Sequence, residues 1–377
     1  MKTVGIICEY NPFHNGHQRQ IQLIRERFGP DTAVVCLMSG NYVQRGAPAL
    51  LDKSIRAQAA VLSEADLVLE LPVTVSLSSA EGFASGGVAI LRRCCDVLCF
   101  GTESMTEEML LQTASALLSP PFSDYLKTEM NSGCSFPKAR QQALERMGIH
   151  AALSNPNDIL GVEYAKAILS QNASMDIFPV SRNGDYHSDV LNPQAPSATA
   201  LRRALLSGEA WQNAVPEGTI PLLQNAAFHT LAAGEKAILS KLRTMTDADF
   251  ERLPYGSEGL WRKLMKACRV KSDLSAIIEA TKSKRYTRTR IDRMILCAFL
   301  GLTEEDMGII PSRIRALAFD DRGRSILRSS GCFCNAGEAV DEEDQRIGSL
   351  YGLFAVAGIE PPDLETKRRI FYYQEKS

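Results

Sequence analysis

Short apolar runs alternate with amphipathic stretches through the first hundred residues of the chain. The apolar runs at residues 3–8, 33–38, 67–71 and 97–100 are bounded by Gly, Pro, Asp or Ser, which predicts strands. The stretches 16–28, 53–63 and 80–93 repeat apolar residues every three to four positions, which predicts helices. Strands that are apolar on both faces and alternate with helices form mostly parallel sheets covered on both sides. We therefore predict an α/β fold with a Rossmann-like doubly wound parallel sheet, which binds ligands beyond the carboxyl ends of its strands.

Helical patterns dominate the rest of the chain. We expect helices at residues 106–118, 136–147 and 159–169, a strand at 175–180, and a polar loop that leads into a helix starting near Ser197. Beyond Ser207 the pattern is helical and charge-rich, with turn signals at residues 216–221 and 254–259. We therefore predict two domains, an α/β domain at residues 1–207 and a mainly helical domain at residues 208–377.

Composition narrows the class of protein. The chain has 377 residues, of which 45% are apolar and 23% charged, so a disordered or fibrous protein is excluded. No apolar stretch approaches the roughly 20 residues that span a bilayer, and the charged start leaves no room for a signal peptide. The ten cysteines include no C-x-x-C pair, so neither a zinc site nor a disulfide framework is predicted. We expect a cytoplasmic protein with reduced thiols and no membrane partner.

Positive charge is concentrated in one segment, although the formal net charge of the chain is only -2. Residues 262–293 contain eleven Lys or Arg against Asp273, Glu279 and Asp292, a local excess of eleven minus three, or +8. Such a segment is a candidate phosphate-facing surface.

The segment His14-Asn15-Gly16-His17 lies between the first predicted strand and the first predicted helix. A helix N-terminus offers unpaired backbone N–H groups and partial positive charge to an anion. Gly16 would let a phosphate approach closely, and two imidazoles three residues apart can lie on one side of the turn. Histidines that donate to phosphate oxygens would stabilise the charge that develops as pyrophosphate leaves. The alternative is a polar turn without a catalytic role.

A second motif opens the helix that starts near Ser197. Its sequence, Ser197-Ala198-Thr199-Ala200-Leu201-Arg202, combines two hydroxyls with an arginine three residues after the threonine. These side chains suit the β- and γ-phosphates of a nucleotide. Ser and Thr also cap helices, and taken alone the capping interpretation is favoured.

The two motifs together resemble the paired signatures of the H-x-G-H nucleotidyltransferase superfamily. Longer strings are similar to those of the bacterial tRNA(Met) cytidine acetate ligase family. They are residues 4–17 (V-G-I-I-C-E-Y-N-P-F-H-N-G-H), 38–46 (M-S-G-N-Y-V-Q-R-G), 66–72 (D-L-V-L-E-L-P), 101–104 (G-T-E-S), 154–158 (S-N-P-N-D) and 285–291 (R-Y-T-R-T-R-I). The string that ends in E-Y-N-P-F-H-N-G-H is specific, whereas each later string is only suggestive by itself.

This resemblance implies an ATP-dependent ligase. Members of the family activate acetate as acetyl-adenylate and pass the acetyl group to the exocyclic amine of the wobble cytidine of elongator tRNA(Met), which gives N4-acetylcytidine. The expected partners of this chain are then acetate and tRNA, with no protein partner implied. The expected cofactor is ATP, with Mg²⁺ accompanying the triphosphate. The domain at residues 1–207 would bind ATP and carry catalysis, and residues 208–377 would bind tRNA.

The resemblance also implies a set of site residues. His14 and His17 would be catalytic, and the nucleotide would contact Ile7, Cys8, Glu9, Tyr10, Asn11, Pro12, Phe13, His14, Asn15, Gly16, His17, Gln18, Arg19, Gln20, Gly101, Asn157, Arg182, Ser197, Thr199 and Arg202. For three of these residues an ordinary role stays open. Gly101 would also suit a simple turn, Asn157 could cap a helix, and Arg182 could form a surface ion pair.

Three further features leave alternatives open. The loop at residues 39–46 could line an acetate pocket, with Arg45 contacting a carboxylate or RNA, or could be an ordinary solvated loop. Asp66 and Glu70 flank a strand, and we interpret both as structural. RNA would contact Lys282, Lys284, Arg285, Tyr286, Arg288, Arg290 and Arg293, with Tyr286 stacking on a base, unless these residues form a plain solvated helix face.

Two other functions compete with the ligase hypothesis. An adenylyltransferase that makes a small dinucleotide cofactor would share the H-x-G-H motif but would not need the basic segment. A catalytically silent nucleotide- or RNA-binding protein belongs to a different class. Measuring pyrophosphate release with ATP and a panel of acceptors separates all three.

Overall fold

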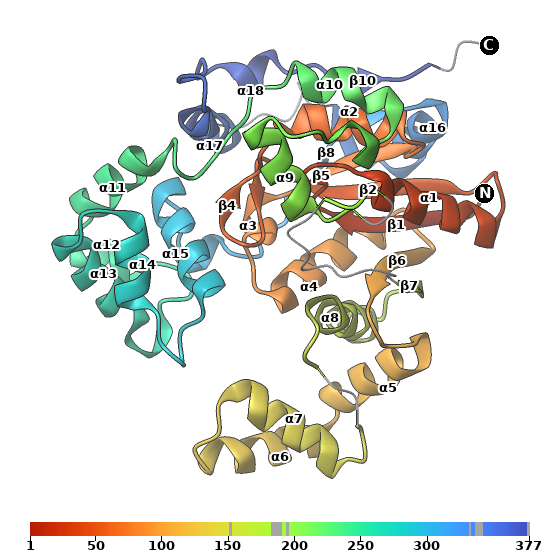
Figure 1. Cartoon of the computed structure of the whole chain (residues 1–377). Helices are drawn as coiled ribbons and strands as arrows, with labels where there is room; N and C mark the ends of the chain where they lie inside the picture. The colour runs from red at the N-terminus through yellow and green to blue at the C-terminus, as the bar shows by residue number, and fades with distance from the viewer. Residues whose placement is uncertain (151–152, 182–190, 194–195, 332, 336–341, 375–377) are drawn as a thin grey trace.

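Figure 1 shows the computed structural model of the chain. The structure describes residues 1–377 apart from 151–152, 182–190, 194–195, 332, 336–341 and 375–377. No helix in these described ranges is long and apolar enough to cross a membrane.

A mostly parallel sheet forms the centre of the molecule. Its strands lie in the order β10-β8-β5-β2-β1-β6-β7, with β9 paired to β8. Five of them were predicted and run parallel to one another: β1 (Thr3–Cys8), β2 (Ala33–Ser39), β5 (Leu67–Leu71), β6 (Val97–Thr102) and β7 (Asp176–Ser181). The predicted doubly wound parallel sheet is therefore confirmed.

Side chains that alternate along these strands build a core on each face of the sheet. Val4 and Ile6 face the helices α1 and α2, while Ile7 faces the opposite layer with α4 and α8. The bounds of these covering helices are α1 (Asn15–Phe28), α2 (Lys53–Leu62), α4 (Ala80–Leu91) and α8 (Pro156–Ser170). Both faces of the strands are apolar because both are covered.

A small helical protrusion follows β6. It consists of α5 (Glu107–Leu118), α6 (Pro120–Asn131) and α7 (Phe136–Arg146), and α6 and α7 lie far from the sheet at the bottom of Figure 1. The pattern analysis did not predict α6. It begins with two prolines, which are tolerated in the first helical turn because the first N–H groups of a helix have no intrahelical partner.

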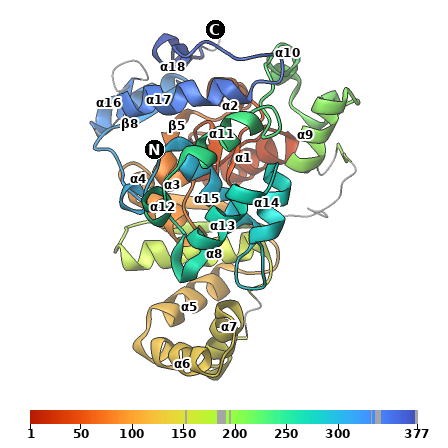
Figure 2. The ribbon, with the colours of Figure 1, turned by 90° about the vertical axis from the view of Figure 1, so that its left-hand side faces the viewer.

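A separate helical subdomain lies beside the carboxyl ends of the strands. It contains α11 (Glu235–Thr244), α12 (Asp247–Glu251), α13 (Leu260–Val270), α14 (Leu274–Thr281) and α15 (Arg288–Leu300). These helices share a core of their own, in which Leu264, Ile277 and Ile295 are buried. The helices α9 (Ala198–Ser207) and α10 (Ile220–Gln224) connect the sheet to this subdomain. In Figure 2 the molecule is rotated by 90° about the vertical axis, so that this subdomain, on the left of Figure 1, faces the viewer.

The end of the chain returns to the sheet, in a way that the sequence pattern did not predict. β8 (Ile314–Phe319) pairs antiparallel with β5, and β10 (Phe371–Tyr372) pairs parallel with β8. The other elements of this segment are β9 (Phe333–Asn335), α16 (Asp321–Ser330), α17 (Glu342–Tyr351) and α18 (Leu364–Lys367). Residues 208–377 are thus divided between the helical subdomain and the sheet, which differs from the expected single helical domain.

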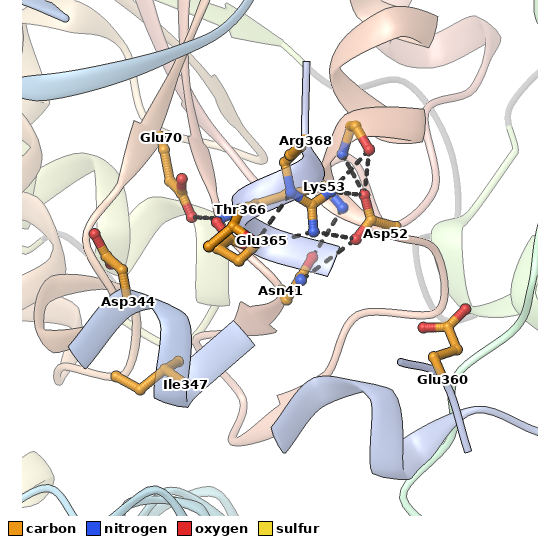
Figure 3. Close-up of polar contacts among 12 residues, drawn as sticks. Asn41, Asp52, Lys53, Glu70, Asp344, Ile347, Glu360, Glu365, Thr366 and Arg368 are labelled. Atoms are coloured by element: carbon orange, nitrogen blue, oxygen red, sulfur yellow. Dashed lines mark hydrogen bonds and ion pairs between the residues drawn. The ribbon is translucent and has the colours of Figure 1, made fainter. Parts of the chain in front are cut away.

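Seven charged side chains, which we call the C-terminal ionic cluster, join the end of the chain to the start of α2 and to the strands β5 and β8. They are Asp52, Lys53, Glu70, Arg315, Asp344, Glu365 and Arg368. In Figure 3, Arg368 lies beside Asp52, and Lys53 lies among the carboxylates of Glu70 and Glu365. Arg368 donates to both carboxylate oxygens of Asp52, one of them at 2.8 Å. Burial by itself raises the pKa of Asp52, but Arg368 and Ser54 together hold it well below the usual range for an aspartate.

The two strand-flanking carboxylates both make structural contacts. Glu70 accepts from Lys53 at 2.6 Å and from Arg315 at 2.8 Å. Asp66 accepts from the backbone N–H of Val34 at 2.6 Å and from Arg25 at 3.0 Å. Both carboxylates therefore hold strands and helices together, in keeping with their structural interpretation.

Candidate active site

A wide cleft of about 1690 Å³ opens at the carboxyl ends of the parallel strands. Its walls come from the turn after β1, from the hairpin formed by β3 (Tyr42–Val43) and β4 (Ala47–Pro48), and from α8, α9 and α15. This is the edge at which doubly wound sheets bind ligands, because the loops that follow neighbouring strands converge there.

His14 and His17 lie at the centre of this cleft. Their rings stack with centroids 3.6 Å apart, and the backbone N–H of His14 donates to Nδ1 of His17 at 3.2 Å. His14 is buried and His17 partly exposed, and Tyr10 packs against the ring of His17 with centroids 4.8 Å apart. The pair is therefore held in one orientation before any ligand binds.

Gly16 permits this stacking. A Cβ at this position would lie 3.1 Å from the ring of His14, so a larger residue would press on the imidazole. Gly16 is also in the first turn of α1, which begins at Asn15. The N-terminus of α1 and the two imidazoles together suit an anionic group.

The start of α9 lies beside the same turn, although it follows that turn by almost two hundred positions in the sequence. Nη1 of Arg202 donates to the carbonyl of Asn11 at 2.8 Å, and Nη2 donates to Oγ1 of Thr199 at 3.1 Å. Oγ of Ser197 accepts from the backbone N–H of Ala200 at 3.0 Å and so caps the helix. Ser197, Thr199 and Arg202 all line the cleft, so Ser197 both caps the helix and lines the cleft.

Arg56 lies beneath the cleft and supports the backbone of the loops that line it, a role that the sequence did not indicate. Its side chain is completely buried, and its guanidinium donates to the carbonyls of Glu9 at 2.6 Å, Ser39 at 3.0 Å and Leu51 at 2.9 Å, and also to that of Gly40. Burial lowers the pKa of Arg56, although nearby acidic groups oppose this. One side chain thus joins the ends of β1 and β2. A lone arginine inside a helical pattern gives no sequence signal for such a role.

A more apolar part of the cleft lies between β6 and α8. Gly101, in the last part of β6, lines it together with Phe100 and Tyr164, whose rings lie 5.2 Å apart. Asn157 lies in the first turn of α8 and donates to Glu103, which also lines the cleft. Flat aromatic walls with a few polar groups suit a nucleobase. Phe100 and Tyr164 were not predicted, because their spacing also fits an ordinary core.

The cleft brings together most of the expected nucleotide contacts. Those that line it are Ile7, Cys8, Glu9, Tyr10, Asn11, His14, Asn15, Gly16, His17, Gln18, Arg19, Gln20, Gly101, Asn157, Ser197, Thr199 and Arg202. Pro12 and Phe13 are instead buried beneath the turn and do not line the cleft. Arg182 lies outside the described residues.

The residues expected to contact RNA lie in three different environments: some are exposed, one is buried in the subdomain and one lines the cleft. Lys282, Lys284 and Arg285 are exposed in the connection between α14 and α15. Tyr286 is buried and donates its hydroxyl to the carbonyl of Glu258 at 2.6 Å, so its ring packs in the subdomain instead of being presented to a base.

The three arginines at the start of α15 also differ from one another. Arg288 pairs with Asp292 at 2.8 Å, and Arg290 donates to the carbonyl of Tyr255 at 3.0 Å. Arg293, among the described members of the expected RNA set, is the one that lines the cleft.

Comparisons with known proteins agree with this geometry. The family model described as HIGH Nucleotidyl Transferase matches residues 1–332. A tRNA(Met) cytidine acetate ligase of Acetivibrio thermocellus is 32% identical over 87% of this chain and 85% of its own length. One of Thermosipho melanesiensis is 35% identical over 87% of this chain and 81% of its own length.

Solved structures give the same result. The crystal structure of Thermotoga maritima TmcAL (apo, form I) has a TM-score of 0.89 at 29% identity and covers 99% of both chains. The crystal structure of that protein bound with alpha-thio ATP has a TM-score of 0.87 at 29% identity and covers 99% of this chain and 100% of that one. The chain therefore belongs to the tRNA(Met) cytidine acetate ligase family.

Proposed function

We propose that this chain is an ATP-dependent ligase that acetylates the wobble cytidine of elongator tRNA(Met). The observation that carries the proposal is the stacked pair of His14 and His17 at the N-terminus of α1, in the cleft of a chain whose relatives have this fold and are named as ligases. Such a turn suits the phosphates of ATP, and the relatives, which are named as tRNA(Met) cytidine acetate ligases, indicate acetate and tRNA(Met) as the other substrates. A cytoplasmic location belongs to the same proposal.

The reaction has two steps. A carboxylate oxygen of acetate attacks the α-phosphorus of ATP, the bond to the β-phosphate oxygen breaks, and pyrophosphate leaves with that bonding pair. The exocyclic amine of cytidine then attacks the acetyl carbonyl carbon, and the bond to the AMP oxygen breaks. AMP leaves with the electron pair, and the amine loses one proton. Adenylation is needed because a free carboxylate has no adequate leaving group.

The residues of the cleft act mainly by position and charge. His14 and His17 donate to phosphate oxygens and stabilise the negative charge that grows as pyrophosphate leaves. Arg202, Ser197 and Thr199 approach from α9 and contact the β- and γ-phosphates. Holding ATP and acetate in line supplies the rest of the rate acceleration, because it makes a bimolecular reaction effectively unimolecular.

Magnesium is expected to enter with the triphosphate. Within the described residues no group of three or more His, Cys, Asp or Glu side chains is placed to hold a metal ion. Phosphate oxygens and waters would then supply most of the ligands of Mg²⁺, because this ion loses its bound water reluctantly.

The test is acetate-dependent exchange of labelled pyrophosphate into ATP, followed by transfer of labelled acetyl to tRNA(Met). Exchange that requires acetate, and label on the wobble cytidine, are the expected results. An adenylyltransferase would instead release pyrophosphate only with a mononucleotide acceptor. A silent binding protein would bind ATP and release no pyrophosphate. Either result would overturn the proposal.

A further inference from the structure

The cleft continues past the histidine turn to the helical subdomain. Its wall there comes from the β3–β4 hairpin, from residues 229–230 and from the first turns of α15. Arg45, Thr289 and Arg293 line this part, which we call the α15 end of the cleft. None of the residues expected to contact ATP belongs to α15.

Gly46 fixes the hairpin against α15. It has a φ of +80°, and a Cβ at this position would lie 2.4 Å from the backbone nitrogen of Arg293. Next to it in the hairpin, the N–H of Gln44 donates to the carboxylate of Glu9 at 2.8 Å. Glu9 follows β1 directly. The α15 end is therefore held close to the strand end that leads into the histidine turn, where acetyl-adenylate would form.

Arg293 is the cationic side chain of this end that comes from α15. It is partly buried, its guanidinium lies 5.0 Å from the centre of the Tyr255 ring, and its Nε has no hydrogen-bond partner among the described residues. The neighbouring arginines of α15 differ, since Arg288 pairs with Asp292 and Arg290 donates to the carbonyl of Tyr255. A partly buried guanidinium that lines a cleft and pairs with no carboxylate among the described residues suits an anionic group on a ligand.

The surface that leads to Arg293 fits a nucleic-acid backbone. The exposed Lys282, Lys284 and Arg285 occupy the connection that ends at the start of α15. Thr289 and Arg293 are four residues apart in that helix and so lie on the same face. Exposed positive side chains thus precede α15 in the sequence, and Arg293 follows within that helix at the cleft, an order that suits a chain of phosphates.

We propose that Arg293, with Thr289 beside it, binds an RNA phosphate next to the cytidine that accepts the acetyl group. The inference rests on the proposed function and deepens it, because it assigns the acceptor end of the cleft. Arg293 is a positioning residue, since phosphate contacts fix the register of a nucleic acid and leave the chemistry to the reacting groups. It acts in the transfer step and not in the activation of acetate.

Two variants test this assignment. Arg293→Met keeps an apolar stem against Tyr255 and removes the charge. Thr289→Glu changes an exposed side chain and places a carboxylate where the phosphate would lie. The matched control is Arg269→Met, which removes one positive charge from α13 of the same subdomain, where the arginine pairs with Asp247 outside the cleft.

Each protein is measured in both half-reactions. Acetate-dependent ATP–pyrophosphate exchange without tRNA should stay within about twofold of wild type for all three variants. Single-turnover acetyl transfer to tRNA(Met) should fall at least tenfold in Arg293→Met and in Thr289→Glu, and should be unchanged in Arg269→Met. Arg293→Lys should recover part of the transfer, because it restores the charge but not the planar fork.

Three outcomes would overturn the inference. Exchange that falls as much as transfer would place Arg293 at the triphosphate. Transfer at the wild-type rate in both variants would remove phosphate binding from this end of the cleft. An equal loss of transfer in Arg269→Met would mean that only the total charge of the subdomain matters. Failure of the proposed function is distinguishable, because the wild-type protein would then show no acetate-dependent exchange.

Discussion

Stacking against His17 fixes the orientation of His14, so both imidazoles are placed to donate to a phosphate in the cleft. We expect His14→Ala and His17→Ala each to slow acetate-dependent pyrophosphate exchange at least tenfold, about 1.4 kcal/mol or more of transition-state stabilisation. His150→Ala, which changes an exposed histidine outside the cleft, is the matched control and should exchange at the wild-type rate. Wild-type exchange in both active-site variants would refute the assignment.

Arg202 donates to the carbonyl of Asn11 at 2.8 Å, so replacing this arginine removes a support of the histidine turn whether or not it also binds phosphate. If its guanidinium also contacts the β- and γ-phosphates, Arg202→Ala should weaken ATP binding more than AMP binding. Competition binding with the two nucleotides measures the difference. Equal losses would show that the arginine acts only as a support for the turn.

Some single residues could be identified from the sequence and others could not. His14 and His17 were recognisable because two imidazoles and a glycine directly after a strand have few structural uses. Arg56 gave no signal, since its role depends on carbonyls from three separate segments. Tyr286 was wrongly expected to be available for stacking, because a basic sequence context does not reveal that its hydroxyl is bound inside the subdomain.

Among the elements, the short helix α18 contributes strongly to the stability of the fold. It contains Glu365 and is followed directly by Arg368, and both belong to the C-terminal ionic cluster. Removing Arg368 leaves the carboxylate of Asp52 partly buried without its main partner. We expect Arg368→Met to lower the free energy of unfolding by about 2 to 3 kcal/mol at neutral pH. Lys367→Met breaks an exposed pair with Asp363 and should cost much less, because water screens an exposed ion pair. Urea unfolding of the two variants measures both values, and equal losses would contradict the prediction.

The stabilisation from Asp52 also has a defined dependence on pH. Its pKa in the folded state is held below the unfolded value of about 3.9, so the folded protein favours the charged carboxylate. This contribution is present above about pH 4 and is lost as the pH falls below that value. The difference in unfolding free energy between wild type and Arg368→Met should therefore shrink below about pH 4. A difference that stays constant down to pH 3 would show that the ion pair is not its source.

Elements with a strong local pattern could be predicted, and those defined by distant partners could not. The strands β1, β2 and β5 were located within one residue, because each is a continuous apolar run between turn residues. The strand β8 contains an arginine and follows a helical region, and what makes it a strand is its pairing with β5, about 250 positions earlier. The hairpin of β3 and β4 has two residues in each strand and too little length to form a pattern.

At the scale of the whole molecule, activation and tRNA capture are expected to be separable. Lys284 and Arg285 are exposed on the helical subdomain. Replacing both with Gln should weaken tRNA binding and reduce the slope of log affinity against log salt by about 1 for each phosphate that is no longer neutralised. Acetate-dependent exchange without tRNA should not change.

Replacing Lys236 and Lys241 of α11 with Gln is the matched control, because it removes the same charge from exposed positions elsewhere in the subdomain. The control should leave the salt slope of tRNA binding unchanged. An unchanged slope in the Lys284 and Arg285 variant would mean that RNA contacts lie elsewhere.

The return of the chain to the sheet has a consequence for the synthesis of the protein on the ribosome. When β5 leaves the exit tunnel, the partner for its open edge, β8, is still about 250 residues from leaving it. At about 5 to 20 residues per second, this edge stays uncovered for roughly 12 to 50 s. During that time it can pair with other nascent chains, since an uncovered edge strand is a template for aggregation. Rare codons or stalling between these two strands should therefore lower the yield of soluble enzyme more than the same delay placed after β8.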